Sequence, residues 1–241
     1  MKLRVMTYNT QSGFALGREV HDFRPQADHI ASYDPDVVAL QEVSIRHPKG
    51  EQIDYPAEVA KRIGMNYLFG KAMDLPPNGI YGVAVLSKYP LEPVDSIILP
   101  VPEGIEPRPA LIVKVCAPTP FYMVSTHLSY QGEMENDDAF RVEQLKYLTS
   151  VLAEKQLSPV ILAGDLNSAP EDDSINFLRK SFDVFSDNSG LGPTCTNNKF
   201  GWQQIDFITG FPQGKFACKQ IFRGNDRTAS DHYAVITDLE F

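Results

Sequence analysis

The sequence predicts one α/β domain built on mixed β-sheets. Short apolar segments typical of strands alternate with segments whose apolar residues have helical spacing, and Gly, Pro, Asp and Asn join most of them. Several strand-like segments also follow one another directly between residues 82 and 125. Consecutive strands form hairpins, which introduce antiparallel pairs into a sheet. No repeat or linker-like composition interrupts the chain, so a single domain over residues 1–241 is expected.

The first half begins with alternating strands and helices. Strands are predicted at Leu3–Tyr8 and Val37–Leu40, and a helix over about Phe23–Ser32 lies between them. A second helix is predicted at Tyr55–Ile63. The consecutive strands that follow are Gly82–Leu86, Ser96–Leu99, Ala110–Val115 and Phe121–Ser125.

The second half returns to alternation. Ala139–Glu154 is predicted to be a helix because its apolar residues recur at helical spacing. Val160–Ala163 is a short apolar strand, and Ile175–Leu178 lies in a helix whose start is marked by Pro170 and acidic residues. The remaining strands are predicted at Ile205–Thr209, Phe216–Phe222 and Ala234–Leu239.

Bulk properties limit the function classes. Acidic residues exceed basic ones, 31 against 22, and no run of Lys and Arg occurs, so binding of duplex DNA through a basic surface is disfavoured. The three cysteines, Cys116, Cys195 and Cys218, are too few and too far apart for a disulfide framework or a cysteine metal site. We expect isolated buried thiols and a monomeric protein.

The sequence also predicts where the protein resides. No apolar run approaches the roughly 20 residues that cross a bilayer. The segment Met1–Asn9 is basic and then apolar, but Arg4 interrupts it and no small-residue cleavage site follows, so it is interpreted as a strand. A cytoplasmic location is expected, and secretion only if a leader has been removed.

Polar side chains follow several of the predicted strands. In open α/β sheets ligands bind beyond strand ends, so these groups are expected to converge on one crevice. Taken singly, each has an ordinary alternative as a turn residue, a helix cap or a hydrogen-bonded structural His. The segments concerned are Asn9, Gln41-Glu42, Thr126-His127, Asp165-Leu166-Asn167 and Ser230-Asp231-His232.

Asp206 differs because it lies between strand residues. A buried carboxylate is costly unless it has a partner. His232 is the natural candidate, since a carboxylate can orient an imidazole ring.

The donor types indicate the chemistry. Carboxylates and amides at Glu42, Asp165, Asp231, Asn9 and Asn167 are hard oxygen donors, which favour Mg²⁺, Mn²⁺ or Ca²⁺. No cysteine cluster or HExxH pattern offers a zinc site. A hard cation beside His and amide groups suits hydrolysis of a phosphate ester, because it neutralises phosphate charge while another group activates water.

The ordered set of motifs resembles the endonuclease/exonuclease/phosphatase superfamily, which includes DNase I, AP endonucleases, neutral sphingomyelinases, inositol polyphosphate 5-phosphatases and deadenylases. The resemblance implies a four-layer α/β sandwich, with two packed mixed sheets and helices outside. The matching segments are Thr7-Tyr8-Asn9, Leu40-Gln41-Glu42, Gly82–Ser87, Ser125-Thr126-His127-Leu128, Gly164-Asp165-Leu166-Asn167, Gln204-Ile205-Asp206-Phe207 and Ser230-Asp231-His232.

The resemblance also implies roles. Glu42 would be the principal ligand of Mg²⁺, or of Mn²⁺, with Asn9 and Asp231 in the same metal region. Asp165 and Asn167 would position or deprotonate the attacking water and contact the phosphate.

The remaining matched positions would act on the phosphate. His127 would hydrogen-bond to the phosphoryl oxygens. Asp206 would orient His232, which would serve as acid/base or transition-state stabiliser. Arg108 lies where family members often carry an Arg before a strand, and a plain surface Arg is its alternative.

Two features of the sequence indicate which branch of the family, and which class of substrate, the chain resembles. AP endonucleases usually carry Tyr where this chain has His127. The loop Ser129–Asp138 contains Glu133, Glu135, Asp137 and Asp138, which would repel an extended polyanion if the loop borders the site. A small phosphodiester, a phosphomonoester or a lipid head group is therefore preferred as substrate. A DNA or RNA nuclease is the alternative, followed by a non-catalytic binding protein of the same fold. Substrate packing or core packing is open for Tyr130, Phe200 and Trp202.

Overall fold

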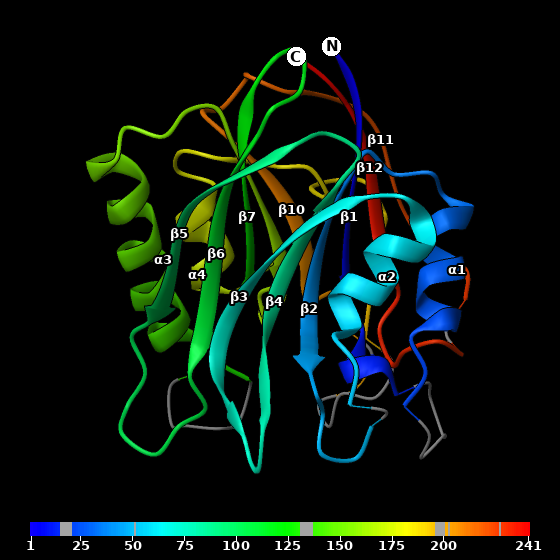
Figure 1. Ribbon diagram of the computed structural model, residues 1–241. Coiled ribbons are helices and arrows are strands. Elements are labelled where there is room, and N and C mark those ends of the chain that lie inside the picture. The colour runs from blue at the N-terminus through cyan, green and yellow to red at the C-terminus, as the bar shows by residue number, and fades with distance from the viewer. Residues whose placement is uncertain (15–20, 51, 131–136, 196–200, 202, 227) are drawn as a thin grey trace.

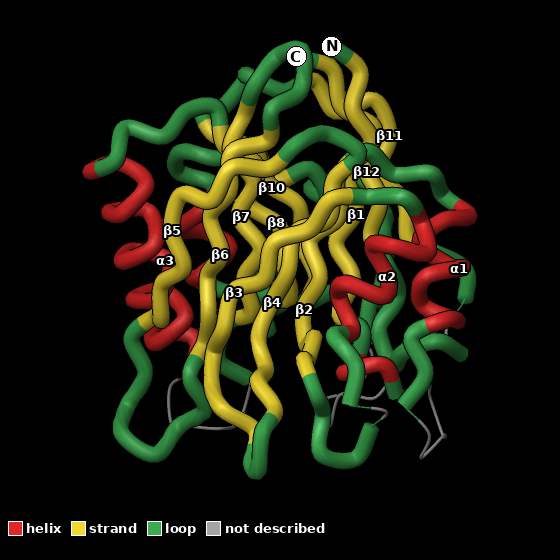
Figure 2. The backbone as a smooth tube through the Cα atoms, viewed as in Figure 1, coloured by secondary structure: helices red, strands yellow, loops and turns green. Residues whose placement is uncertain are grey.

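Two six-stranded sheets lie face to face in the computed structural model, with helices on both outer sides (Figures 1 and 2). The structure describes residues 1–14, 21–50, 52–130, 137–195, 201, 203–226 and 228–241.

The first sheet has the strand order β11-β12-β1-β2-β4-β3. β1 and β2 are parallel, whereas the neighbouring pairs are antiparallel. The strand bounds are β1 Lys2–Asn9, β2 Val37–Ile45, β3 Asn66–Leu75, β4 Gly79–Ser87, β11 Ala217–Arg223 and β12 Val235–Glu240.

The second sheet has the order β5-β6-β7-β8-β10-β9. Its parallel pair is β7 with β8, and the other pairs are antiparallel. Both sheets are therefore mixed, as predicted. The strand bounds are β5 Leu91–Leu99, β6 Arg108–Val115, β7 Phe121–His127, β8 Val160–Asp165, β9 Asp183–Val184 and β10 Asp206–Phe211.

Apolar side chains from both sheets fill the space between them, for example Val85 and Ile161. Helices α1 (Arg24–Ser32) and α2 (Tyr55–Ile63) pack on the outer face of the first sheet, where Ile30 and Val59 belong to a second apolar cluster. Helices α3 (Asp137–Glu154) and α4 (Asp173–Leu178) cover the second sheet in the same manner. This is the predicted four-layer sandwich.

Within the described part of the chain, no helix combines the length and apolar character that a transmembrane helix requires.

Two strands were not predicted. β3 is an edge strand with a mixed pattern of exposure and contains Gly70, Lys71 and Asp74, so it lacks the alternation that identifies a half-buried strand. β9 is only two residues long. Neither lies at the carboxyl ends of the parallel pairs, where the polar residues of interest are found.

Candidate active site

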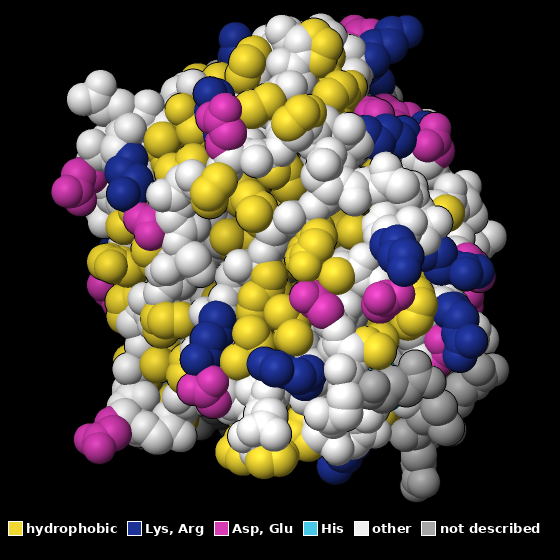
Figure 3. Space-filling model, in the orientation of Figure 1, with side chains coloured by type: hydrophobic (Ala, Val, Ile, Leu, Met, Phe, Trp, Pro, Cys, Tyr) yellow, Lys and Arg dark blue, Asp and Glu magenta, His cyan; other side chains and the backbone are white. Residues whose placement is uncertain are grey.

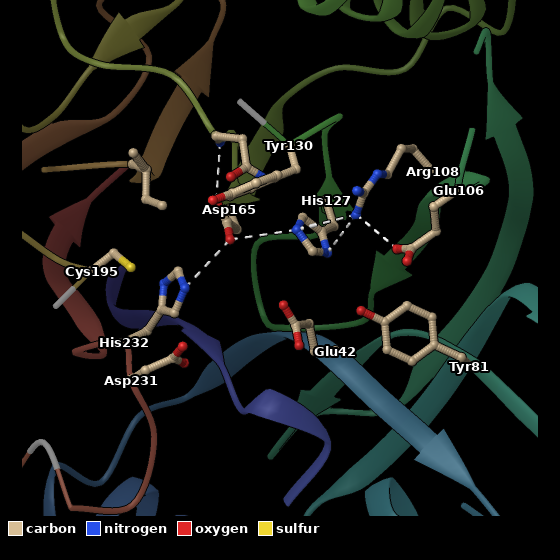
Figure 4. Close-up of a pocket in the computed structure, with 12 residues that line it drawn as sticks. Glu42, Tyr81, Glu106, Arg108, His127, Tyr130, Asp165, Cys195, Asp231 and His232 are labelled. Carbon is tan, nitrogen blue, oxygen red and sulfur yellow. Dashed lines mark hydrogen bonds and ion pairs between the residues drawn. The ribbon is translucent and has the colours of Figure 1, made fainter. Parts of the chain in front are cut away.

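A cavity of about 400 Å³ opens at the strand ends predicted to carry the chemistry (Figure 4). Most of the predicted site residues line it, and Asn9 and Asp206 lie directly behind it, in contact with lining residues. The lining residues are Glu42, Tyr81, Glu106, Arg108, His127, Tyr130, Asp165, Asn167, Cys195, Ile205, Asp231 and His232.

Strand register places Asp165 at the centre of the site residues that the second sheet provides. It lies opposite His127 on the parallel neighbour β7 and opposite Asp206 on the antiparallel neighbour β10. Residues directly opposite on adjacent strands point to the same face. Gly164 permits this close approach, because a Cβ atom there would lie 2.0 Å from the carbonyl oxygen of Thr126.

Backbone irregularities aim two further side chains. The β2–β4 register shifts between Leu40 and Val43, which places Glu42 in a β-bulge with φ of 53°. Asn167, just after β8, has φ of 50°. The left-handed region costs a non-glycine residue about 1 kcal/mol or more, and such strain concentrates at functional sites. Glu42 is thereby turned toward the cavity (Figure 4).

Asn9 joins the two sheets at the site. Its amide Nδ2 donates to Glu42 Oε1 at 2.9 Å and to Asp165 Oδ2 at 3.0 Å. Its Oδ1 accepts from the backbone N–H of Gln11, and its backbone oxygen accepts from the Ser230 hydroxyl at 2.8 Å. Asn9 therefore presents its amide NH₂ to both carboxylates, and it ties down the segment that carries Asp231 and His232.

His232 is held from behind by Asp206. The distance from His232 Nδ1 to Asp206 Oδ2 is 2.9 Å, and Thr194 Oγ1 donates to the same oxygen at 2.6 Å. Thr194 Oγ1 in turn accepts the backbone N–H groups of Ile205 and Asp206. Burial lowers the pKa of His232, but the charge and hydrogen bond of Asp206 outweigh it, so the pKa lies well above its ordinary value. The folded protein therefore favours the protonated ring.

His127 has the opposite charge state. Burial, and then the positive charges of Arg108 and His232, hold its pKa well below the ordinary value. Its Nε2 lies 3.5 Å from Asp165 Oδ2, and Arg108 Nη1 lies 3.4 and 3.5 Å from its ring nitrogens. His127 is therefore a neutral imidazole between a carboxylate and a guanidinium (Figure 4).

Asp165 lies between the two histidines. Its Oδ2 is 3.5 Å from His127 Nε2 and 3.7 Å from His232 Nε2, and its Oδ1 accepts the backbone N–H of Asn167. Burial, and then the negative charge of Asp206, raise the pKa of Asp165 to about 7. Because the pKa is near neutrality, this carboxyl group can both accept and release a proton there.

The donor set beside Glu42 fits a hard divalent cation. Burial raises the pKa of Glu42, so a positive charge beside it would favour its ionised carboxylate, and Asp231 lines the same cavity. A cation would supply that charge. Donor atoms of Asp165, Asp206 and His232 also lie within 4.8 Å of one another. Because a 2.9 Å hydrogen bond already joins His232 Nδ1 to Asp206 Oδ2, this second set suits proton handling better than metal binding.

The structure adds residues that sequence reasoning missed. Tyr81 and Glu106 line the cavity, and Thr194 supports Asp206. The spacing of Glu106 two residues before Arg108 in an extended segment was a usable signal, whereas nothing local marks Thr194. Of the residues expected near a substrate, Tyr130 lines the cavity. Glu133, Glu135, Phe200 and Trp202 lie outside the described residues.

Two packed mixed sheets, with a carboxylate and histidine site at their strand ends, define a phosphoesterase of the DNase I-like fold. The sequence model of the Endonuclease/Exonuclease/phosphatase family matches residues 6–232. The chain belongs to that family, whose members are hydrolases acting on phosphate esters. No curated protein matches the chain.

Solved structures share the fold. An endonuclease/exonuclease/phosphatase from Beutenbergia cavernae is 26% identical with a TM-score of 0.85, and the match covers 100% of this chain and 72% of that one. A Bacteroides thetaiotaomicron mannosyl-6-phosphatase is 19% identical, TM-score 0.73, over 99% of this chain and 100% of that one. D. rerio TDP2, complexed with single-strand DNA product, is 21% identical, TM-score 0.70, over 100% and 99%. The last two likenesses concern the fold alone.

Proposed function

We propose that this chain is a divalent-metal-dependent phosphoesterase that hydrolyses a small phosphodiester or phosphomonoester, on a small molecule or a lipid head group. One observation carries the proposal. A charged His232, held by Asp206, and a carboxyl group with a pKa of about 7 at Asp165 lie around the same cavity as Glu42. Such a site has a proton donor, a proton acceptor and an anionic ligand for a cation.

The size of the cavity and the net charge of the whole chain favour a small substrate. A volume of about 400 Å³ is at the lower end of the range for small-molecule pockets. The formal net charge of −9 disfavours an extended polyanion. On the face shown in Figure 3, acidic and basic side chains are interspersed rather than gathered by sign.

Glu42 and Asp231 would hold Mg²⁺ or Mn²⁺, and the cation would neutralise phosphate charge when bound. Asn9 was expected among the ligands. With its NH₂ group on Glu42 and Asp165, it serves the same region by fixing both carboxylates, and its oxygen would need the amide to rotate before it could bind a cation.

The chain's own groups divide the remaining work. Arg108 and the His232 Nε2–H would donate to phosphoryl oxygens, and neutral His127 would add one N–H. Asp165 would take the proton of the attacking water, with Asn167 beside it. Asp206 would keep His232 charged and oriented throughout.

The test is a substrate panel with purified protein and Mg²⁺ or Mn²⁺, with a chelator control. It compares synthetic diesters, monoesters, sphingomyelin, inositol phosphates and nucleic acids. We expect chelator-sensitive hydrolysis of a small ester or lipid head group. Faster turnover of DNA or RNA would establish the nuclease alternative. No turnover of any ester, with Glu42-dependent metal binding intact, would establish a non-catalytic binding protein.

A further inference from the structure

Arg108 forms an ion pair on the cavity wall with Glu106, a residue that has no part in the chemistry described above. Glu106 Oε1 lies 2.9 Å from Arg108 Nη1, and the exposed fractions of the two side chains are 33% and 5%. Both residues line the cavity. The same nitrogen, Nη1, also lies 3.4 Å from His127 Nε2, so the Arg108 guanidinium contacts both the carboxylate and the ring (Figure 4). A phosphate that reaches Arg108 therefore meets the carboxylate as well.

The local sequence favours this pairing. Pro107 and Pro109 flank Arg108, and each proline fixes φ near −65° and favours an extended conformation in the residue before it. In an extended segment, residues two apart project to the same side. Glu106 and Arg108 consequently lie close together where β6 begins, so their side chains need little rearrangement to form the ion pair.

The charges around the cavity decide how the Glu106–Arg108 ion pair affects the binding of an anionic substrate. Glu42, Asp231, Glu106 and Asp165 contribute carboxyl groups, whereas Arg108 and His232 contribute cations. The charge of His232 is already shared with Asp206. A phosphomonoester carries about 1.5 to 2 negative charges at neutral pH, whereas each phosphodiester group carries one. Repulsion from Glu106 thus acts up to twice as strongly on a monoester.

We propose that Glu106 is a specificity-determining residue: by partly neutralising Arg108, it makes the site favour singly charged phosphodiesters over doubly charged phosphomonoesters. This inference rests on the proposed function and narrows its substrate class. Glu106 sets which ester is accepted, and the catalytic groups set how fast it is hydrolysed.

The experiment compares Glu106→Gln with the wild type. Gln keeps the size of the side chain and can still accept a hydrogen bond from Arg108, but it removes the charge. Glu103→Gln is the matched control, because it makes the same change in net charge at an exposed position three residues earlier that does not line the cavity. Glu106→Asp, which retains the charge, should keep the wild-type preference. Thermal unfolding verifies that each variant is folded.

Two readouts are needed. Calorimetry measures binding of methyl phosphate and dimethyl phosphate, and steady-state assays with Mg²⁺ measure kcat/KM for p-nitrophenyl phosphate and bis-p-nitrophenyl phosphate. We expect Glu106→Gln to tighten methyl phosphate binding about tenfold and dimethyl phosphate about threefold, in line with their charges. The ratio of diester to monoester kcat/KM should fall correspondingly, and Glu103→Gln should change neither quantity.

The outcomes separate this inference from the proposed function. If the wild type hydrolyses an ester but Glu106→Gln leaves both the binding ratio and the kinetic ratio unchanged, Glu106 does not set specificity. An equal change in Glu103→Gln would likewise overturn it, because the effect would then come from net charge. If no ester is hydrolysed, the proposed function fails, and the two binding measurements still decide whether Glu106 discriminates between the anions.

Discussion

The charge of His232 depends on groups that lie behind it. Asp206 supplies the negative charge, and Thr194 fixes the carboxylate through a 2.6 Å hydrogen bond while accepting two backbone N–H groups. Asp206, which does not line the cavity, thus favours the protonated form of His232, which does. The reason is that a carboxylate that accepts a hydrogen bond from imidazole favours the charged ring.

We expect Asp206 and His232 to act as a unit. Asp206→Asn and His232→Ala should each lower kcat by roughly 10²-fold or more. The double variant should lose little beyond the worse single variant, because residues that act together are non-additive. Steady-state kinetics and thermal unfolding on all three variants test this. Fully additive kinetic losses would argue against coupling. An Asp206→Asn variant that loses thermal stability but keeps its turnover would show that Asp206 merely ties two loops together.

Glu42 gives a second residue-scale prediction. Glu42→Gln should nearly abolish turnover while the protein stays folded, because the proposed metal ligand loses the negative charge that would hold the cation. Burial raises the pKa of Glu42, so the ionised carboxylate destabilises the fold at neutral pH, and the metal-free variant should melt at the same temperature as the wild type or higher.

Melting curves with and without Mg²⁺ provide the readout. Added Mg²⁺ should raise the melting temperature of the wild type but not of Glu42→Gln, because only a ligand bound to the folded state stabilises it. Glu92→Gln is the control, since Glu92 is exposed and paired with Lys114. Wild-type metal affinity and turnover in Glu42→Gln would remove the residue from the site.

At the scale of elements, helix α1 carries a buried histidine remote from the chemistry. His29 packs between the rings of Tyr8 and Tyr33, with centroid distances of 5.6 and 5.2 Å. Burial lowers its pKa, and the negative charge of Asp226 opposes this only in part. The folded protein therefore favours the neutral ring.

This makes the docking of α1 sensitive to acid. The neutral ring's contribution should be complete above the ordinary pKa of 6.5 and should be lost as the pH falls from there toward the lowered folded-state value. Chemical denaturation at pH 8 and pH 5 should show a smaller pH-dependent loss in the free energy of unfolding for His29→Gln than for the wild type. Equal losses would show that His29 does not titrate in this range.

The strands and the residues at their ends differ in how much of the site could be predicted from the sequence. The convergence of Asn9, Asp165 and His232 on one region could be predicted because strands with clear periodicity end at, or begin beside, polar residues in a recognisable order. Glu42 was named as a site candidate, but the β-bulge that orients its side chain was not predicted. The spacing of hydrophobic residues contains no information on φ. Thr194 was missed because its role comes from a tertiary contact with Asp206, and no local pattern marks it.

For the whole molecule, net charge governs the response to polyanions. We expect duplex DNA to bind more weakly than roughly 10⁻⁴ M at 0.15 M salt, with a shallow salt dependence, because few basic residues can release counterions. Fluorescence anisotropy over a salt series measures both quantities. Tight binding with a steep salt slope would instead favour the nuclease alternative.

The hydrogen bonds of Asn9 also have a consequence for how the protein acquires activity. Asn9 meets Asp165 and Ser230 across separations of 156 and 221 residues, so the site closes only when remote parts of the chain have come together. Contacts of this kind form slowly during folding, because long loops must close before such contacts can form. On refolding from denaturant, helical circular dichroism should return first and turnover last. Enzymatic activity would then report the completion of folding more faithfully than any spectroscopic signal from the helices.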